Sequence, residues 1–331
     1  MICILGDIHF NASKDYFRAT CEAFLEWFKT WEMNTPSNYL VLAGDVVQDS
    51  INGGIVVRYL EMFYQYSNFK EIHIVVGNHD LKKVNNISQL AYDFYREKPN
   101  FFIHDKATEL LVGTKKFLML PYFTGLNADG LSMSELYSSI ASNPTFSNDY
   151  DAVVGHFCGE DTSFPGSTDC VKNLDKLSGR VCLGHIHTRF TNPGRYIGSV
   201  YAGNKTENDE TRAVWILKDD GAWYEEKLPI FNEFVTVTYP EALPASKARV
   251  PIYTILNCAS ENNAIHHYGN IFIRRTTLSD KDIRSSKKAN DAQDIANIRN
   301  LSTKQLFREF ITSQAFSDSV IKKCEALLEA Y

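Results

Sequence analysis

Short apolar runs recur through the first part of the chain, and all but one end in glycine and a polar residue. They are ICILGD (2–7), YLVLAGD (39–45), IHIVVGNHD (72–80), KFLMLPY (116–122), AVVGH (152–156) and VCLGH (181–185). Short apolar runs bounded by glycine are typical of strands buried on both faces. The pattern therefore predicts sheets inside the protein, with polar side chains at the strand ends.

Helical periodicity fills the first gaps between these runs. Residues 15–31 place apolar side chains on one helical face, namely Phe17, Cys21, Phe24, Leu25 and Phe28. Residues 55–66 and 87–97 show a similar pattern and are predicted to be helices as well. Alternation of strand, helix and strand predicts an α/β domain with largely parallel strand pairing.

The pattern changes after residue 187. Residues 195–240 have the pattern of successive strands, and residues 241–250 that of a linker. A small α+β unit follows with strands near 252–257 and 270–276, and a polar stretch leads to helical periodicity over 301–331. We therefore expect three parts: a catalytic domain at 1–240, a small α+β module at 241–285, and a linker with C-terminal helices at 286–331.

The composition is that of a soluble globular protein, with 44% hydrophobic and 22% charged residues. We expect no membrane segment, because no apolar run approaches the roughly 20 residues that span a bilayer. The first residues lack the basic start of a signal peptide, and the seven cysteines form no C-x-x-C pair. Both features favour a cytoplasmic protein with reduced thiols. A net charge of −6 argues against binding nucleic acid through bulk basicity.

The predicted strand ends gather side chains that bind metals. In open α/β sheets this edge is where ligands bind. Imidazoles together with carboxylates select Mn²⁺, Fe²⁺ or Zn²⁺ over Ca²⁺. Leaving His79 aside, the strand ends offer more ligand groups than one ion needs and enough for two: Asp7, His9, Asp45, Asn78, His156, His185 and His187.

The order of these groups, G-D-x-H, G-D, G-N-H-D, G-H and G-H-x-H, resembles the calcineurin-like metallophosphoesterase superfamily over roughly residues 1–220. The resemblance implies a four-layer α/β sandwich, in which two mixed β-sheets are flanked by helices. It also implies that one ion is held by Asp7, His9 and His187 and the other by Asn78, His156 and His185, with Asp45 bridging them.

The resemblance implies that His79 protonates the leaving oxygen while a metal-activated hydroxide attacks the phosphorus. The neutral oxygen of Asn78 limits the negative charge that faces an anionic substrate. Asp80 either orients His79 by accepting its second N–H or caps an Asx-type turn. We expect two divalent ions, with Mn²⁺ favoured and Mg²⁺ or Fe²⁺ as alternatives.

Three features lean toward a DNA nuclease. Residues 195–199 (RYIGS) resemble the Y-x-G-S element of SbcD-type exonuclease subunits of double-strand-break repair and phage recombination. The α+β module stands where that family carries a DNA-capping domain, and the chain ends in helical patterns. In the module, Arg274 and Arg275 either contact DNA phosphates or form the solvated end of an edge strand. Gln48 stands where that family often has histidine, and it can hydrogen-bond a phosphate or sugar but cannot titrate.

The same resemblance implies partners. The C-terminal helices would bind an SMC-type (SbcC-like) ATPase, in a complex with two copies of each chain, a homodimer within a heterotetramer that acts on DNA. Its place would be the cytoplasm of a bacterium or of a phage-infected cell. The alternatives are a stand-alone small-molecule phosphodiesterase or phosphatase and a non-catalytic scaffold. A scaffold would be expected to have lost ligands.

Overall fold

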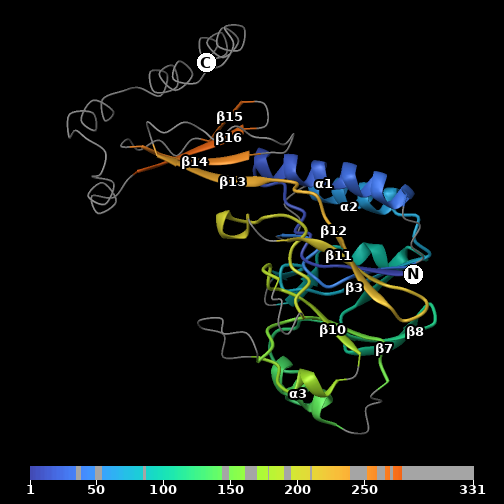
Figure 1. The fold of residues 1–331 in the computed structure, drawn as a ribbon. Helices are drawn as coiled ribbons and strands as arrows, with labels where there is room; N and C mark the ends of the chain where they lie inside the picture. Colours follow the sequence, from blue (N-terminus) through green and yellow to red (C-terminus); the bar gives the residue numbers. More distant parts are fainter. Residues whose placement is uncertain are drawn as a thin grey trace. The chain divides into compact units, whose positions relative to one another are not determined.

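The computed structural model divides the chain into two compact units, Met1–Phe231 and Asn232–Tyr331 (Figure 1). It describes residues 1–34, 39–48, 54–84, 87–143, 149–160, 170–177, 179–189, 195–208, 211–238, 252–258, 265–268 and 271–277. The predicted linker at 241–250, the polar stretch 279–300 and the helices at 301–331 lie outside the described residues.

A six-stranded sheet forms the centre of the first unit. Its order is β12 (Trp223–Lys227), β11 (Ala213–Leu217), β1 (Ile2–Leu5), β2 (Tyr39–Leu42), β3 (Glu71–Val75) and β6 (Phe101–His104). The strands β1, β2, β3 and β6 pair in parallel with their neighbours in this series. At the other edge, β11 pairs antiparallel with β1, and β12 pairs antiparallel with β11. The carboxyl ends of β1, β2 and β3 therefore meet at one edge of this sheet.

A second, four-stranded sheet has the order β10 (Arg180–Gly184), β9 (Ala152–His156), β8 (Lys115–Leu120) and β7 (Thr108–Val112). Its first three strands are parallel and β7 is antiparallel. Both sheets are thus mixed, as expected. Each of the six apolar runs overlaps one strand.

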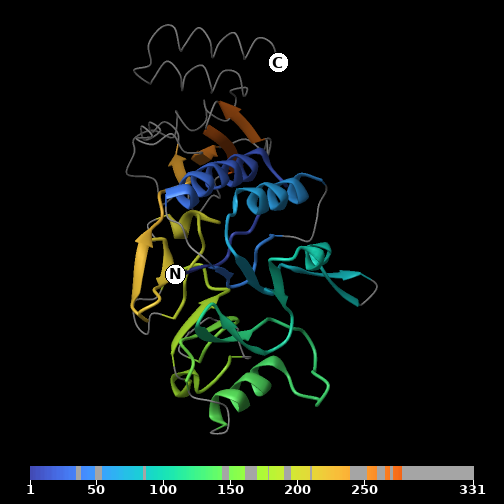
Figure 2. The ribbon, with the colours of Figure 1, turned by 90° about the vertical axis from the view of Figure 1, so that its right-hand side faces the viewer.

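Alternating side chains divide the first unit into layers. Ile2 and Ile4 of β1 pack toward the second sheet, against Phe117 and Met119 of β8. The alternate residues of β1, Cys3 and Leu5, pack with the helices α1 (Asp15–Asn34) and α2 (Gly54–Tyr66). On the far side of the second sheet, β8 packs with α3 (Met133–Ser142). Figure 2 shows α1 and α2 in blue at one side of the two sheets and α3 in green at the other. This order of layers confirms the predicted α/β sandwich.

The helix predicted over 87–97 was wrong. This stretch forms the strand β5 (Ile87–Leu90), which pairs with β4 (Leu81–Val84) in a small antiparallel sheet, and then the 3₁₀ helix η1 (Asp93–Glu97). Some apolar residues of the stretch therefore lie in a strand and others in a short 3₁₀ helix. Their spacing matches a helical face although the stretch is not an α-helix. Two further 3₁₀ turns are η2 (Leu174–Lys176) and η3 (Lys205–Glu207).

The second unit contains a four-stranded sheet of order β13 (Glu233–Thr238), β14 (Ile252–Cys258), β16 (Ile271–Thr277) and β15 (Ile265–Tyr268). β13 pairs with β14, and the boundary between the two compact units falls after Phe231. Arg274 and Arg275 lie on β16, opposite Ile255 and Leu256 of β14. Among the described residues, no helix is both long and apolar enough to cross a membrane.

Candidate metal centre

The backbone turns sharply where the predicted ligands begin. Asp7, His9, Asp45 and His185 all have positive φ angles, of 50°, 51°, 50° and 81°. Residues other than glycine rarely adopt this left-handed region, and each such residue costs of order 1 kcal/mol or more, which the surrounding structure must offset. Strain of this kind collects at functional sites. Here it turns the ends of three strands toward one point.

Glycine is required beside these turns. Gly44 has a φ of 86°, and a Cβ placed on it would overlap the ring of His156. A Cβ on Gly77 would likewise overlap the Asp45 side chain and backbone. The two glycines therefore leave the space into which the His156 ring and the Asp45 carboxylate fit.

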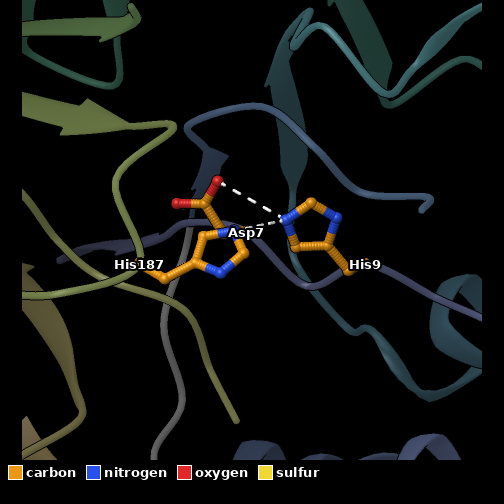
Figure 3. Close-up of side chains that lie close together, drawn as sticks. All are labelled: Asp7, His9 and His187. Atoms are coloured by element: carbon orange, nitrogen blue, oxygen red, sulfur yellow. Dashed lines mark hydrogen bonds and ion pairs between the residues drawn. The ribbon is translucent and has the colours of Figure 1, made fainter. Parts of the chain in front are cut away.

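A first group of ligand atoms comes from Asp7, His9 and His187. One donor atom from each lies within 4.8 Å of the others. His9 Nε2 lies 2.9 Å from His187 Nε2 and 3.9 Å from Asp7 Oδ1, and Figure 3 shows the three side chains turned toward one another. The three residues come from the end of β1 and the loop after β10, so chain positions 178 residues apart meet here.

The chemistry of this first group fits a cation. Asp7 is fully buried, and within the described part of the chain its Oδ2 has no hydrogen-bond partner. An unpaired buried carboxylate oxygen is costly, and a metal ion would satisfy it. Burial raises the pKa of Asp7 to about 6 and lowers the pKa of His9 to about 3. The low value keeps the His9 imidazole neutral, which is the form that binds metals.

A second group surrounds His156. Ligand atoms of Asp7, Asp45 and His156 converge within 4.8 Å. The Asn78 side-chain oxygen lies 3.0 Å from His156 Nε2 and 2.9 Å from His185 Nδ1. His156 Nδ1 lies 2.8 Å from the Ala43 carbonyl oxygen. A proton on Nδ1 donated to that carbonyl leaves Nε2 free to face the site, the arrangement common for metal-binding histidines.

Asp45 lies between the two groups. Its Oδ2 is 3.7 Å from His9 Nε2 and 3.2 Å from His156 Nε2, so one oxygen faces a histidine of each group. Its Oδ1 accepts the backbone N–H of His79 at 2.8 Å, which fixes the carboxylate in this direction. Burial acts to raise the pKa of Asp45, but the neighbouring His156 and His9 outweigh it and lower the pKa. A bridging ligand requires this position and an ionised carboxylate.

His79 and Gln48 lie together at the edge of the centre. The His79 ring centroid is 5.2 Å from that of His9, and its Nδ1 lies 2.6 Å from the Gln48 backbone oxygen. The Gln48 side-chain nitrogen is 3.4 Å from the same Nδ1. Gln48 therefore supplies the acceptor that orients His79.

Asp80 is held by backbone N–H groups from two loops. This carboxylate is fully buried and accepts the backbone N–H groups of Gly77 at 2.8 Å and Val47 at 3.1 Å. It thus caps the turn after β3 and ties it to the loop after β2. The other predicted role of Asp80 was to orient His79. In the structure, the Gln48 backbone carbonyl contacts the His79 ring through Nδ1.

No sequence pattern pointed to Glu207, which the structure places behind His187. Glu207 is 5% exposed, its Oε1 lies 3.2 Å from His187 Nδ1, and its Oε2 accepts the Gly203 N–H at 2.8 Å. Burial acts to raise the pKa of Glu207, but His187 outweighs it and lowers the pKa. Glu207 lies in the 3₁₀ turn η3, where no strand end or hydrophobic period marks it.

The Y-x-G-S element supports the same histidine. Ser199 donates its backbone N–H to the His187 carbonyl at 3.2 Å and forms a bridge with Gly6 beside Asp7. The Tyr196 hydroxyl accepts the Gly159 N–H at 2.7 Å. The element therefore fastens the loop after β10 to the end of β1.

The two-sheet sandwich and its paired ligand groups define a class of metal-dependent phosphoester hydrolases. The sequence model described as calcineurin-like phosphoesterase matches residues 1–189, more than half of the chain. The chain belongs to the calcineurin-like phosphoesterase family, whose members bind two divalent metal ions.

Two further comparisons add little. Among solved structures, the chain is similar to a protein of unknown function, AQ665, from Aquifex aeolicus, at 16% sequence identity and a TM-score of 0.28. The match covers 52% of this chain and 89% of that one. No curated protein matches the chain.

Proposed function

We propose that this chain is a two-metal DNA nuclease, the nuclease subunit of an SbcCD-like recombination or repair complex. Asp7, His9 and His187 would hold one ion, Asn78, His156 and His185 the other, and Asp45 both. The observation that carries the two-metal assignment is the Asp45 Oδ2 atom, which lies 3.7 Å from His9 Nε2 and 3.2 Å from His156 Nε2. The donor set of imidazoles, carboxylates and one amide favours Mn²⁺, with Mg²⁺ and Fe²⁺ as alternatives.

The residues of the centre have separate tasks in this mechanism. Bound divalent ions supply positive charge to the phosphate oxygens and lower the pKa of the attacking water. The His79 ring, held through Nδ1 by the Gln48 carbonyl 2.6 Å away, keeps Nε2 for a proton that passes to the leaving oxygen. The Gln48 side chain hydrogen-bonds a phosphate or sugar oxygen.

DNA is the proposed substrate for two reasons. The Y-x-G-S element resembles that of DNA exonuclease subunits. In addition, a separate unit follows Phe231, with adjacent arginines on β16 that suit the phosphate backbone. By the same resemblance, residues 301–331 bind an SMC-type ATPase in the cytoplasm, in a complex with two copies of each chain.

The test is degradation of end-labelled duplex DNA by the full chain with Mn²⁺ or Mg²⁺, with and without the purified ATPase. We expect metal-dependent release of label that EDTA abolishes and that the ATPase with ATP stimulates. Asp45→Ala serves as the inactive control. Intact DNA, together with rapid hydrolysis of 3′,5′-cyclic nucleotides, would identify a small-molecule phosphodiesterase instead.

A further inference from the structure

An opening of about 280 Å³ lies against the first ligand group. His9 and His187 of that group line it, as do Gln48, Asn11 and Phe17. Its volume lies just below the roughly 300–1,000 Å³ of small-molecule sites. Such a space holds one nucleotide and is too small for a length of duplex.

The hydroxyl groups of Tyr201 and Ser199, which also line the opening, are already engaged. The Tyr201 hydroxyl donates to the His9 carbonyl at 2.8 Å, and the Ser199 hydroxyl donates to the Tyr201 carbonyl at 2.7 Å. These bonds hold the wall rigid. They leave the Phe17 ring and the Asn11 amide nitrogen for a ligand, while the Gln48 side-chain nitrogen lies 3.4 Å from His79 Nδ1.

Phe17 is held in place by its neighbours. It lies in the first turn of α1 and is half-buried, with its ring 5.2 Å from the ring of the buried Tyr16 in an edge-to-face arrangement. Lys14 Nζ lies over the ring, 5.9 Å from the Phe17 centroid, and adds positive charge there. An aromatic ring near a lysine is suited to a nucleotide, because the ring can stack on the flat base and the lysine can attract the phosphate.

Asn11 offers a directed donor. Its side-chain oxygen accepts the Ser13 N–H at 2.9 Å, so the amide is anchored through the oxygen. The amide nitrogen has no hydrogen-bond partner within the described part of the chain and remains available to a base or sugar oxygen.

We propose that this opening is a nucleoside subsite, in which Phe17 stacks on the base next to the scissile phosphate and Asn11 hydrogen-bonds the base or sugar. The inference rests on the proposed phosphodiester chemistry and names the group on one side of the cleaved bond. If the inference holds, the centre recognises the nucleoside as well as the phosphate.

The test is competitive inhibition of methyl p-nitrophenyl phosphate hydrolysis by the Mn²⁺-loaded full chain. Thymidine 5′- and 3′-monophosphate are compared with methyl phosphate, which has no base. We expect the wild type to bind one of the two nucleotides more tightly than methyl phosphate. Phe17→Ala should lose roughly tenfold or more of that preference, in line with the loss of one base–aromatic stack. Phe17→Trp should retain it.

The matched control is Phe94→Ala, because Phe94 is 44% exposed and does not line the opening. It should behave as the wild type. The subsite is refuted if the wild type binds neither nucleotide better than methyl phosphate, or if Phe17→Ala keeps the full preference. Failure of the nuclease proposal looks different: DNA stays intact while the nucleotide preference and its loss in Phe17→Ala persist.

Discussion

Replacing Glu207 by glutamine tests how His187 is held in the first ligand group. The substitution keeps the size of the side chain but removes the negative charge that faces His187 Nδ1 at 3.2 Å. Loss of a hydrogen-bonded partner behind a metal-binding histidine typically weakens metal affinity 10- to 100-fold. Because 3.2 Å is at the long end for an N–H···O bond, we expect the lower part of this range, about tenfold or ~1.4 kcal/mol.

The assay is calorimetric titration of metal-free protein with Mn²⁺. Glu207 contacts a residue of the first group, so one of the two binding events should weaken about tenfold while the other stays unchanged. Glu160→Gln is the matched control, since the exposed Glu160 also accepts a backbone N–H, that of Asn173 at 2.7 Å. If both events weaken equally, or if Mn²⁺ affinity is unchanged while the metal-free protein unfolds at a lower temperature, Glu207 is a structural residue and the reasoning is refuted.

Three further predictions concern the centre and the first sheet. His79→Ala should keep both ions but lose roughly 10²- to 10⁴-fold in rate, the usual contribution of a general acid; an ion missing by elemental analysis would make His79 a ligand. Asp45→Ala should abolish Mn²⁺-dependent hydrolysis, because it removes the oxygen that faces both groups; a near-normal rate would exclude the shared role. Burial lowers the pKa of His104 from 6.5 to about 4, and His73 Nδ1 lies 3.0 Å from its Nε2. The unfolded chain therefore binds more protons, and stability should fall from about pH 6.5 toward pH 4 by up to ~3 kcal/mol. Denaturant unfolding at several pH values should show this loss, and His104→Gln should reduce it; an equal loss in both proteins would contradict the assignment.

The convergence of the proposed ligands was predictable because each of them follows a glycine-bounded apolar run. Such runs mark buried strands, and their ends meet at one sheet edge, so Asp7, Asp45 and His156 could be expected together before any contact was known. The left-handed backbone at Asp7 and Asp45 could not be read from the same pattern, since glycine stands beside these residues and not at them.

Other features depend on contacts between distant segments. Glu207 lies in a short 3₁₀ turn, and only the fold brings it behind His187. His79 is oriented by the Gln48 backbone carbonyl. Every residue has a backbone carbonyl, so the sequence cannot indicate this contact. The stretch 87–97 has helical spacing, but pairing of β5 with β4 overrides it.

The most direct test of the two-metal assignment is anomalous scattering from crystals of the Mn²⁺-loaded protein at the manganese edge. We predict two peaks about 3.5–4 Å apart. One should be bound by Asp7, His9 and His187 and the other by Asn78, His156 and His185, with the Asp45 carboxylate between them. A single peak, or two peaks of which only one contacts Asp45, would contradict it.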